Sequence, residues 1–143
     1  MSLIVHKYGG TSMGSTERIK NVAKRVAKWH RAGFQMVVVP SAMSGETNRL
    51  IGLAKEIQAE PDPRELDMLC CTGEQASVGL LAMALKGDGV DAISFSGWQV
   101  PIQPDSSHTK ARTESFDDPT RKTALNRGKA VASTGILRNG SAR

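Results

Sequence analysis

The chain opens with a short apolar run that ends abruptly in a lysine, two glycines and two hydroxyl residues: Lys7, Gly9, Gly10, Thr11 and Ser12. An apolar run of this length predicts a strand, and the pattern that follows it is helical. Glycines allow an anion to approach main-chain N–H groups closely. A helix N-terminus adds its own N–H groups and dipole at the same point. The sequence therefore predicts a strand–turn–helix unit that contains the parts needed to hold a phosphoryl group.

A purely structural role for this turn stays open on local sequence alone. Strand, Gly-Gly and helix follow one another in many α/β proteins. The turn is neither a Walker A loop, which ends in Gly-Lys-Ser/Thr, nor a Gly-x-Gly-x-x-Gly loop. Because Lys7 precedes the glycines, it would reach an anion from the end of the strand.

Alternating strand and helix patterns predict an α/β fold with a mainly parallel sheet. A first helix, capped by Ser15 or Thr16 and ended at Gly33, carries apolar residues at helical spacing: Ile19, Val22, Ala23 and Val26. A continuous apolar run at 36–39 then predicts a buried central strand. We expect parallel strands near residues 3–7, 36–39, 91–95 and 130–134, with helices on both faces of the sheet.

A second loop, rich in hydroxyl groups, follows Pro40 and runs from Ser41 to Asn48. It lies at the carboxyl end of its strand, the edge at which open α/β sheets bind ligands. Alternatively, Ser44 or Thr47 caps the next helix, which we expect over residues 49–59. The two interpretations are compatible, because a capping hydroxyl can also face a ligand.

A third segment, Thr72-Gly73-Glu74, interrupts the helical pattern between residues 64–71 and 75–86. Glu74 would then occupy the first turn of a helix, where the helix dipole ordinarily explains a glutamate. Its carboxylate could equally face a ligand ammonium group, because its neighbours are small. Local sequence favours the dipole explanation.

Composition argues against nucleic-acid and membrane binding. The formal net charge is +5, but the basic residues lie on one predicted helix and in the last third without interleaved aromatic residues. We find no long apolar span and no leader segment, and we expect a cytoplasmic protein. Cys70 and Cys71 are adjacent, which rarely permits a bridge, so we expect reduced core residues.

The polar stretch at 103–118 predicts an exposed excursion or hairpin, with surface roles for His108, Lys110 and Arg112. Pro119 suits the first turn of a helix that runs to about Asn126.

Three separate blocks resemble the aspartate kinases of the amino acid kinase family: Lys-Tyr-Gly-Gly-Thr-Ser at 7–12, Val-Val-Val-Pro-Ser-Ala-Met-Ser-Gly-Glu-Thr-Asn at 37–48, and Thr-Gly-Glu-Gln at 72–75. The resemblance implies the amino acid kinase (carbamate kinase-like) fold, a three-layer α/β sandwich with a mainly parallel sheet. It implies transfer of the ATP γ-phosphate to the β-carboxylate of L-aspartate with Mg²⁺. The product, 4-phospho-L-aspartate, begins the routes to lysine, threonine and methionine.

The resemblance also implies roles for individual residues. Lys7 would be catalytic, neutralising charge on the transferred phosphoryl group, and Glu74 would pair with the ammonium group of aspartate. The nucleotide phosphates would contact Lys7, Tyr8, Gly9, Gly10, Thr11 and Ser12. The amino acid would contact Ser41, Thr47 and Glu74. No residue is implied as a metal ligand.

The resemblance covers about residues 1–135, the N-terminal part of a catalytic domain, and leaves a tail at 136–143 that does not match. Family members continue with a second glycine loop, an adenine pocket and regulatory domains. We therefore keep two hypotheses: an aspartate kinase, forming homo- or hetero-oligomers, or a truncated and catalytically silent fragment that binds only small anions or a partner chain.

Overall fold

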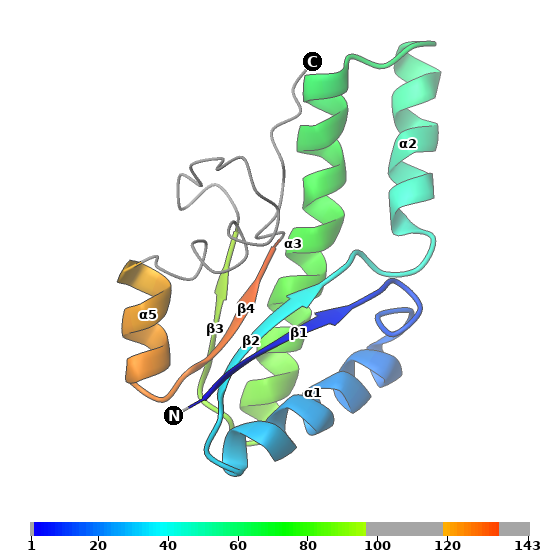
Figure 1. Ribbon diagram of the computed structural model, residues 1–143. Helices are drawn as coiled ribbons and strands as arrows, with labels where there is room; N and C mark the ends of the chain where they lie inside the picture. Colours follow the sequence, from blue (N-terminus) through cyan, green and yellow to red (C-terminus); the bar gives the residue numbers. More distant parts are fainter. Residues whose placement is uncertain (1, 97–118, 135–143) are drawn as a thin grey trace.

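The computed structural model describes residues 2–96 and 119–134, which form one α/β unit (Figure 1). Its elements in chain order are β1 (Leu3–Tyr8), α1 (Thr16–Arg31), β2 (Gln35–Pro40), α2 (Glu46–Ile57), α3 (Pro63–Gly87), β3 (Ala92–Phe95), α5 (Pro119–Asn126) and β4 (Ala130–Ser133). The expected excursion at 103–118, with His108, Lys110 and Arg112, and the tail at 136–143 lie outside the described residues.

The strands form a parallel sheet in the order β1-β2-β4-β3. Strand β1 pairs with β2 along its whole length, which sets Lys7 beside Val39. The strands predicted near 3–7, 36–39, 91–95 and 130–134 are all confirmed. The central strands β2 and β4 carry the most continuous apolar runs, as expected for strands that are covered on both faces.

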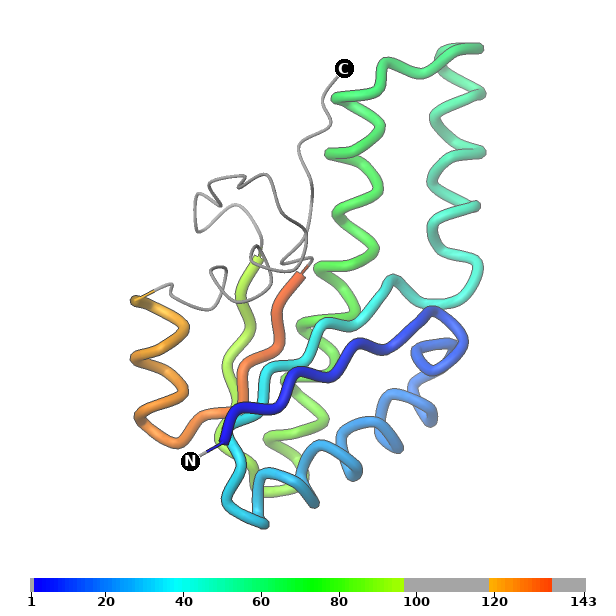
Figure 2. Tube along the Cα trace, viewed as in Figure 1, coloured from blue at the N-terminus to red at the C-terminus, as the bar shows by residue number. Residues whose placement is uncertain are grey.

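Helices cover both faces of the sheet, which confirms the three-layer arrangement. On one face, Val26 of α1 and Leu81 of α3 share a core with Val38 of β2. On the other face, α5 packs Ala124 and Leu125 against a second cluster that contains Val37, Phe95 and Val131. Figure 2 shows that the hairpin of α2 and α3 extends beyond the carboxyl ends of β1 and β2.

Helix α3 is continuous, so the break expected at Thr72-Gly73-Glu74 is wrong. Gly73 is buried inside the helix, where a Cβ atom would lie 3.2 Å from Ala42 Cβ and from Glu46 Cγ. A glycine stands in mid-helix because the helix passes very close to the loop after β2. A glycine in a helical pattern marks either a stop or such a contact, and only the folded chain distinguishes the two.

Helix α2 begins at Glu46 rather than at Arg49, and the alternative in which Ser44 or Thr47 caps it is wrong. The N-cap is Gly45, whose φ of 81° is left-handed, and no side chain caps the helix. Glycine takes this conformation without steric cost. The hydroxyl of Thr47 instead belongs to the first turn of the helix, where it is exposed.

Helix α3 is long and apolar enough to cross a membrane by length and composition alone, whereas no such span was expected from the sequence. Its second half packs in the core, where Leu81 and Leu85 are fully buried. We therefore interpret α3 as a core helix. In its first half, Cys70 and Cys71 form no disulfide bond, and both are half-buried rather than in the core as expected.

His6 is expected to make stability depend on pH. Its Nδ1 lies 3.1 Å from the Tyr8 hydroxyl, and burial, followed by the charge of Arg25, lowers the pKa of His6 from its ordinary value of 6.5. The unfolded chain then binds this proton more tightly, so the free energy of unfolding falls as the pH drops below about 6.5 and levels off below the folded-state pKa. Urea unfolding at pH 7.5 and 5.5 should show this loss, and His6→Gln should reduce it. An equal loss in both proteins would contradict the expectation.

Candidate functional site

The turn after β1 is closed by hydrogen bonds within itself. The amide of Met13 donates to the carbonyls of Gly9 at 3.3 Å and Gly10 at 3.1 Å, and the Met13 side chain is fully buried. Within residues 2–96 and 119–134, the structure records no acceptor for the amides of Gly10, Thr11 and Ser12. Thr11 and Ser12 are also exposed. The turn therefore offers N–H and hydroxyl donors just before the N-terminus of α1, the arrangement that binds anions.

Arg18 holds this turn from the first helix, a role that sequence reasoning missed. Its Nη1 donates to the carbonyl of Thr11 at 2.7 Å, and its own amide is capped by Ser15 Oγ at 3.2 Å. The sequence pattern placed Arg18 only on the solvated basic side of the helix. Its position one turn after the cap of a helix that follows a glycine loop is the signal that could have revealed the contact.

Three segments that are distant in sequence meet at Ala42, in the loop after β2. A Cβ atom on Gly10 would lie 3.3 Å from the Ala42 carbonyl oxygen. The amide of Ser41 donates to the Tyr8 carbonyl at 2.8 Å, which ties the ends of β1 and β2 together. From the other side, a Cβ atom on Gly73 of α3 would lie 3.2 Å from Ala42 Cβ. The first, second and third blocks of the sequence thus lie together at the carboxyl edge of the sheet.

Lys7 and Glu74 approach this edge from different layers. Ile4 and Tyr8 pack into the core that α1 and α3 cover, so the alternation along β1 directs the exposed Lys7 to the other face. Glu74 is half-buried on α3, next to the contact that Gly73 makes with Ala42. The two side chains can act on one ligand only around the edge of the sheet, beyond the ends of the strands.

The side chain of Tyr8 packs in the core and does not face the glycine turn. It is 8% exposed, and its hydroxyl lies 3.1 Å from His6 Nδ1. Burial raises the pKa of Tyr8, and the nearby Arg25 partly offsets that rise. The phosphate contact expected of Tyr8 would therefore have to come from its main chain.

An ion pair that the sequence analysis did not single out borders the same edge. Arg49 binds Glu46 through two hydrogen bonds, Nη2–Oε1 at 2.6 Å and Nε–Oε2 at 3.1 Å. The hydrogen bond from Arg49 lowers the pKa of Glu46. Because Glu46 also contacts the position of Gly73, the pair places a neutralised carboxylate where α2 and α3 meet the loop.

The described part of the chain contains no group of three His, Cys, Asp or Glu side chains that could hold a metal ion. The hydroxyls and amides of the first turn suit phosphate oxygens. A Mg²⁺ ion usually takes only one or two protein carboxylates and is otherwise held by water and substrate phosphates. The described residues thus fit a phosphate group but do not by themselves form a magnesium site.

Gly10 and Gly9 provide a matched test of the contact between the loops. Neither residue has a positive φ, so an added methyl group strains neither backbone. In Gly10→Ala the new Cβ presses on the Ala42 carbonyl, whereas a Cβ on Gly9 meets no atom within 4 Å. We expect Gly10→Ala to lower the free energy of unfolding by about 1–3 kcal/mol and Gly9→Ala to change it by less than about 0.5 kcal/mol. Equal urea midpoints for the two variants would contradict this packing.

Comparisons with known proteins agree with the resemblance. A model of the amino acid kinase family matches residues 2–142. The aspartokinase of Pseudomonas aeruginosa is 54% identical over 136 residues, which are 95% of this chain and 33% of that protein. The crystal structure of aspartate kinase from Synechocystis matches with a TM-score of 0.77 and 40% identity, over 94% of this chain and 22% of that chain.

The fold is shared more widely. Escherichia coli aspartokinase III, solved in complex with aspartate and ADP, matches with a TM-score of 0.69 at 22% identity, over 94% of this chain and 40% of that one. The chain spans about a third of the length of the Pseudomonas relative. Because the family model matches the sequence almost from end to end, the chain belongs to the amino acid kinase family.

Proposed function

We propose that this chain forms the front part of an aspartate kinase site, which transfers the γ-phosphate of ATP to the β-carboxylate of L-aspartate. The observation that carries the proposal is the meeting of Gly10, Ala42 and Gly73, because it joins the three blocks that resemble aspartate kinases. The 54% identity with the Pseudomonas aspartokinase supports the same substrate. We further propose that the protein acts in the cytoplasm.

The reaction demands positioning and charge neutralisation more than proton transfer. A carboxylate oxygen of aspartate forms a bond to the γ-phosphorus while the bond from that phosphorus to the bridging oxygen breaks, and ADP leaves with the electron pair. The attacking oxygen is already ionised, so no general base is needed. Lys7 would neutralise charge on the transferred group, and the amides of Gly10 to Ser12 would donate to its oxygens.

The amino acid would be held by the second and third segments. Ser41 is half-buried and Thr47 exposed at the start of α2, and both offer hydroxyl donors. Glu74 would pair with the ammonium group, which leaves the β-carboxylate to face the phosphate. Bound with the nucleotide, Mg²⁺ would supply further neutralisation of phosphate charge.

A polypeptide of these 143 residues should not turn over by itself. It spans 33% of the length of its Pseudomonas relative. The donors proposed here, Lys7 and the amides of the glycine turn, would approach the phosphoryl group from one side only. Removing a single donor from such a site typically costs on the order of 3 kcal/mol in the transition state. Among the described residues β1 is an edge strand with Leu3 and Val5 39% and 44% exposed, which favours self-association.

Two measurements test the proposal. NMR titration with ATP should shift the amides of residues 9–14, and Lys7→Ala should weaken binding by roughly tenfold, the loss of one charged hydrogen bond. Lys28→Ala, in the last turn of α1, is the matched control and should bind ATP as the wild type does. Unchanged binding in Lys7→Ala would contradict the proposed site. A hydroxamate assay with ATP, Mg²⁺ and L-aspartate should give no product, and turnover that Lys7→Ala abolishes would show that these residues suffice.

A further inference from the structure

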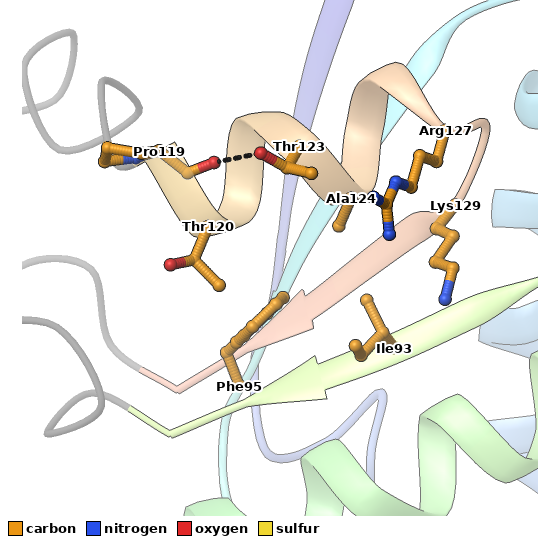
Figure 3. A pocket seen from close by; sticks show the side chains of 8 residues that line it. All are labelled: Ile93, Phe95, Pro119, Thr120, Thr123, Ala124, Arg127 and Lys129. Atoms are coloured by element: carbon orange, nitrogen blue, oxygen red, sulfur yellow. Dashed lines mark hydrogen bonds between the residues drawn. The ribbon is translucent and has the colours of Figure 1, made fainter.

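A second pocket lies at the opposite edge of the sheet from the glycine turn. Its volume is about 400 Å³, and it lies between β3 and α5 (Figure 3). Strand order β1-β2-β4-β3 separates it from the end of β1 by the width of the sheet. It shares no lining residue with the three segments that meet at Ala42, so nothing in the proposed kinase site accounts for it.

The floor of this pocket is apolar. Ile93 and Phe95 line it from β3, and Ala124 lines it from α5. The Phe95 ring is held in place by Arg121, whose guanidinium carbon lies 5.2 Å from the ring centroid and whose Nη2 donates to Ser133 Oγ at 2.9 Å. Because Arg121 is only 3% exposed, this support is part of the core and fixes the floor. A rigid apolar floor suits a flat or branched hydrocarbon group.

Among the described residues that line the pocket, two are cations and none is acidic. Arg127 and Lys129 line the same end of the pocket, and Figure 3 shows both side chains reaching from the end of α5 toward β3. Neither has an ion-pair partner among the residues that the structure describes. At the other end the Thr120 side chain lines the rim, while the Thr123 hydroxyl donates a hydrogen bond to the Pro119 carbonyl at 2.7 Å. An arginine and a lysine that line the same pocket as an apolar floor suit an oxyanion attached to an apolar body.

We propose that this pocket binds a small amphiphilic anion, a carboxylate or phosphate monoester whose apolar body lies on Ile93 and Phe95. The oxyanion lies between Arg127 and Lys129, where the guanidinium can donate hydrogen bonds to two of its oxygens. The volume accommodates a ligand near the lower end of the range for small-molecule sites. The pocket is thus a second ligand site, independent of the kinase assignment.

The test is an NMR titration of the whole chain with four probes: 3-phenylpropionate, phenyl phosphate, the neutral 3-phenylpropanamide, and acetate. The two aryl anions should shift amides of residues 93–95 and 120–129, and the neutral amide and acetate should bind at least roughly tenfold more weakly. The ratio of the two anion affinities identifies the preferred head group.

Variants distinguish recognition of the ligand's charge from nonspecific hydrophobic binding. Arg127→Gln combined with Lys129→Gln should weaken both aryl anions by roughly tenfold or more, while Lys122→Gln on the exposed side of the same helix should leave them unchanged. Equal binding of the neutral amide, equal binding by the double variant, or absence of shifts at 93–95 and 120–129 would each overturn the proposal. ATP binding is measured at the amides of residues 9–14, which are not those of this pocket. Failure of the pocket proposal therefore leaves the kinase proposal unaffected, and failure of the kinase proposal leaves the pocket proposal unaffected.

Discussion

Leu81→Ala is expected to lower the free energy of unfolding by about 2–5 kcal/mol. Leu81 lies in the second half of α3, has no exposed surface and belongs to the cluster that joins α1, α3 and the sheet. Removing its branched side chain loses apolar burial and leaves a cavity between layers that cannot fully collapse. Since domains of this size are stable by about 5–15 kcal/mol, the variant should lose a large fraction of its stability.

Met83→Ala is the matched control, because it removes a large apolar side chain from the same helix at a position that is 69% exposed. We expect this change to alter the free energy of unfolding by less than about 0.5 kcal/mol. Urea unfolding followed by circular dichroism measures both. A similar loss in the two variants would mean that α3 does not pack on the sheet as described.

The strands could be predicted from sequence because each is an apolar run bounded by turn residues. Met36 to Val39, for example, is apolar on both faces, and only a central strand of a covered sheet requires this. The limits of α1 were equally predictable, since Ser15 caps it and Gly33, with a φ of 99°, follows it. These are local signals, and local physics is sufficient to interpret them.

The failures share a different cause. Gly73 was misjudged because its role is to allow a close approach to Ala42, and Gly45 was overlooked because its role is a left-handed cap. Neither role is visible in the neighbouring residues. Arg18 was missed because its partner is a main-chain carbonyl, which any sequence supplies. Lys7 and Glu74 belong to different layers for two reasons: side chains alternate along β1, and α3 packs on one particular face of the sheet. The alternation can be predicted from sequence, but the face on which α3 packs is a property of the whole fold.

Gly73→Leu is expected to destabilise the chain and to disturb the candidate site, because it acts where the three segments of that site meet. A Cβ atom at this position already lies within 3.2 Å of Ala42 Cβ and Glu46 Cγ, and 3.6 Å from Leu50 Cδ1. A leucine side chain would therefore push α3 away from the loop after β2. We expect a loss of about 1–3 kcal/mol in the free energy of unfolding from this overpacking, even though leucine favours helix more than glycine.

Gly79→Leu, in the same helix, separates packing from helix propensity. A Cβ atom there meets nothing within 4 Å, so this variant should gain up to about 1 kcal/mol from propensity alone. Hydrogen exchange gives the local signal: the Ser41 amide, which donates to the Tyr8 carbonyl, should exchange faster in Gly73→Leu and unchanged in Gly79→Leu. If the Ser41 amide stays protected while Gly73→Leu unfolds more easily, then α3 contributes stability without shaping the loop. The third segment would then have to be removed from the candidate site.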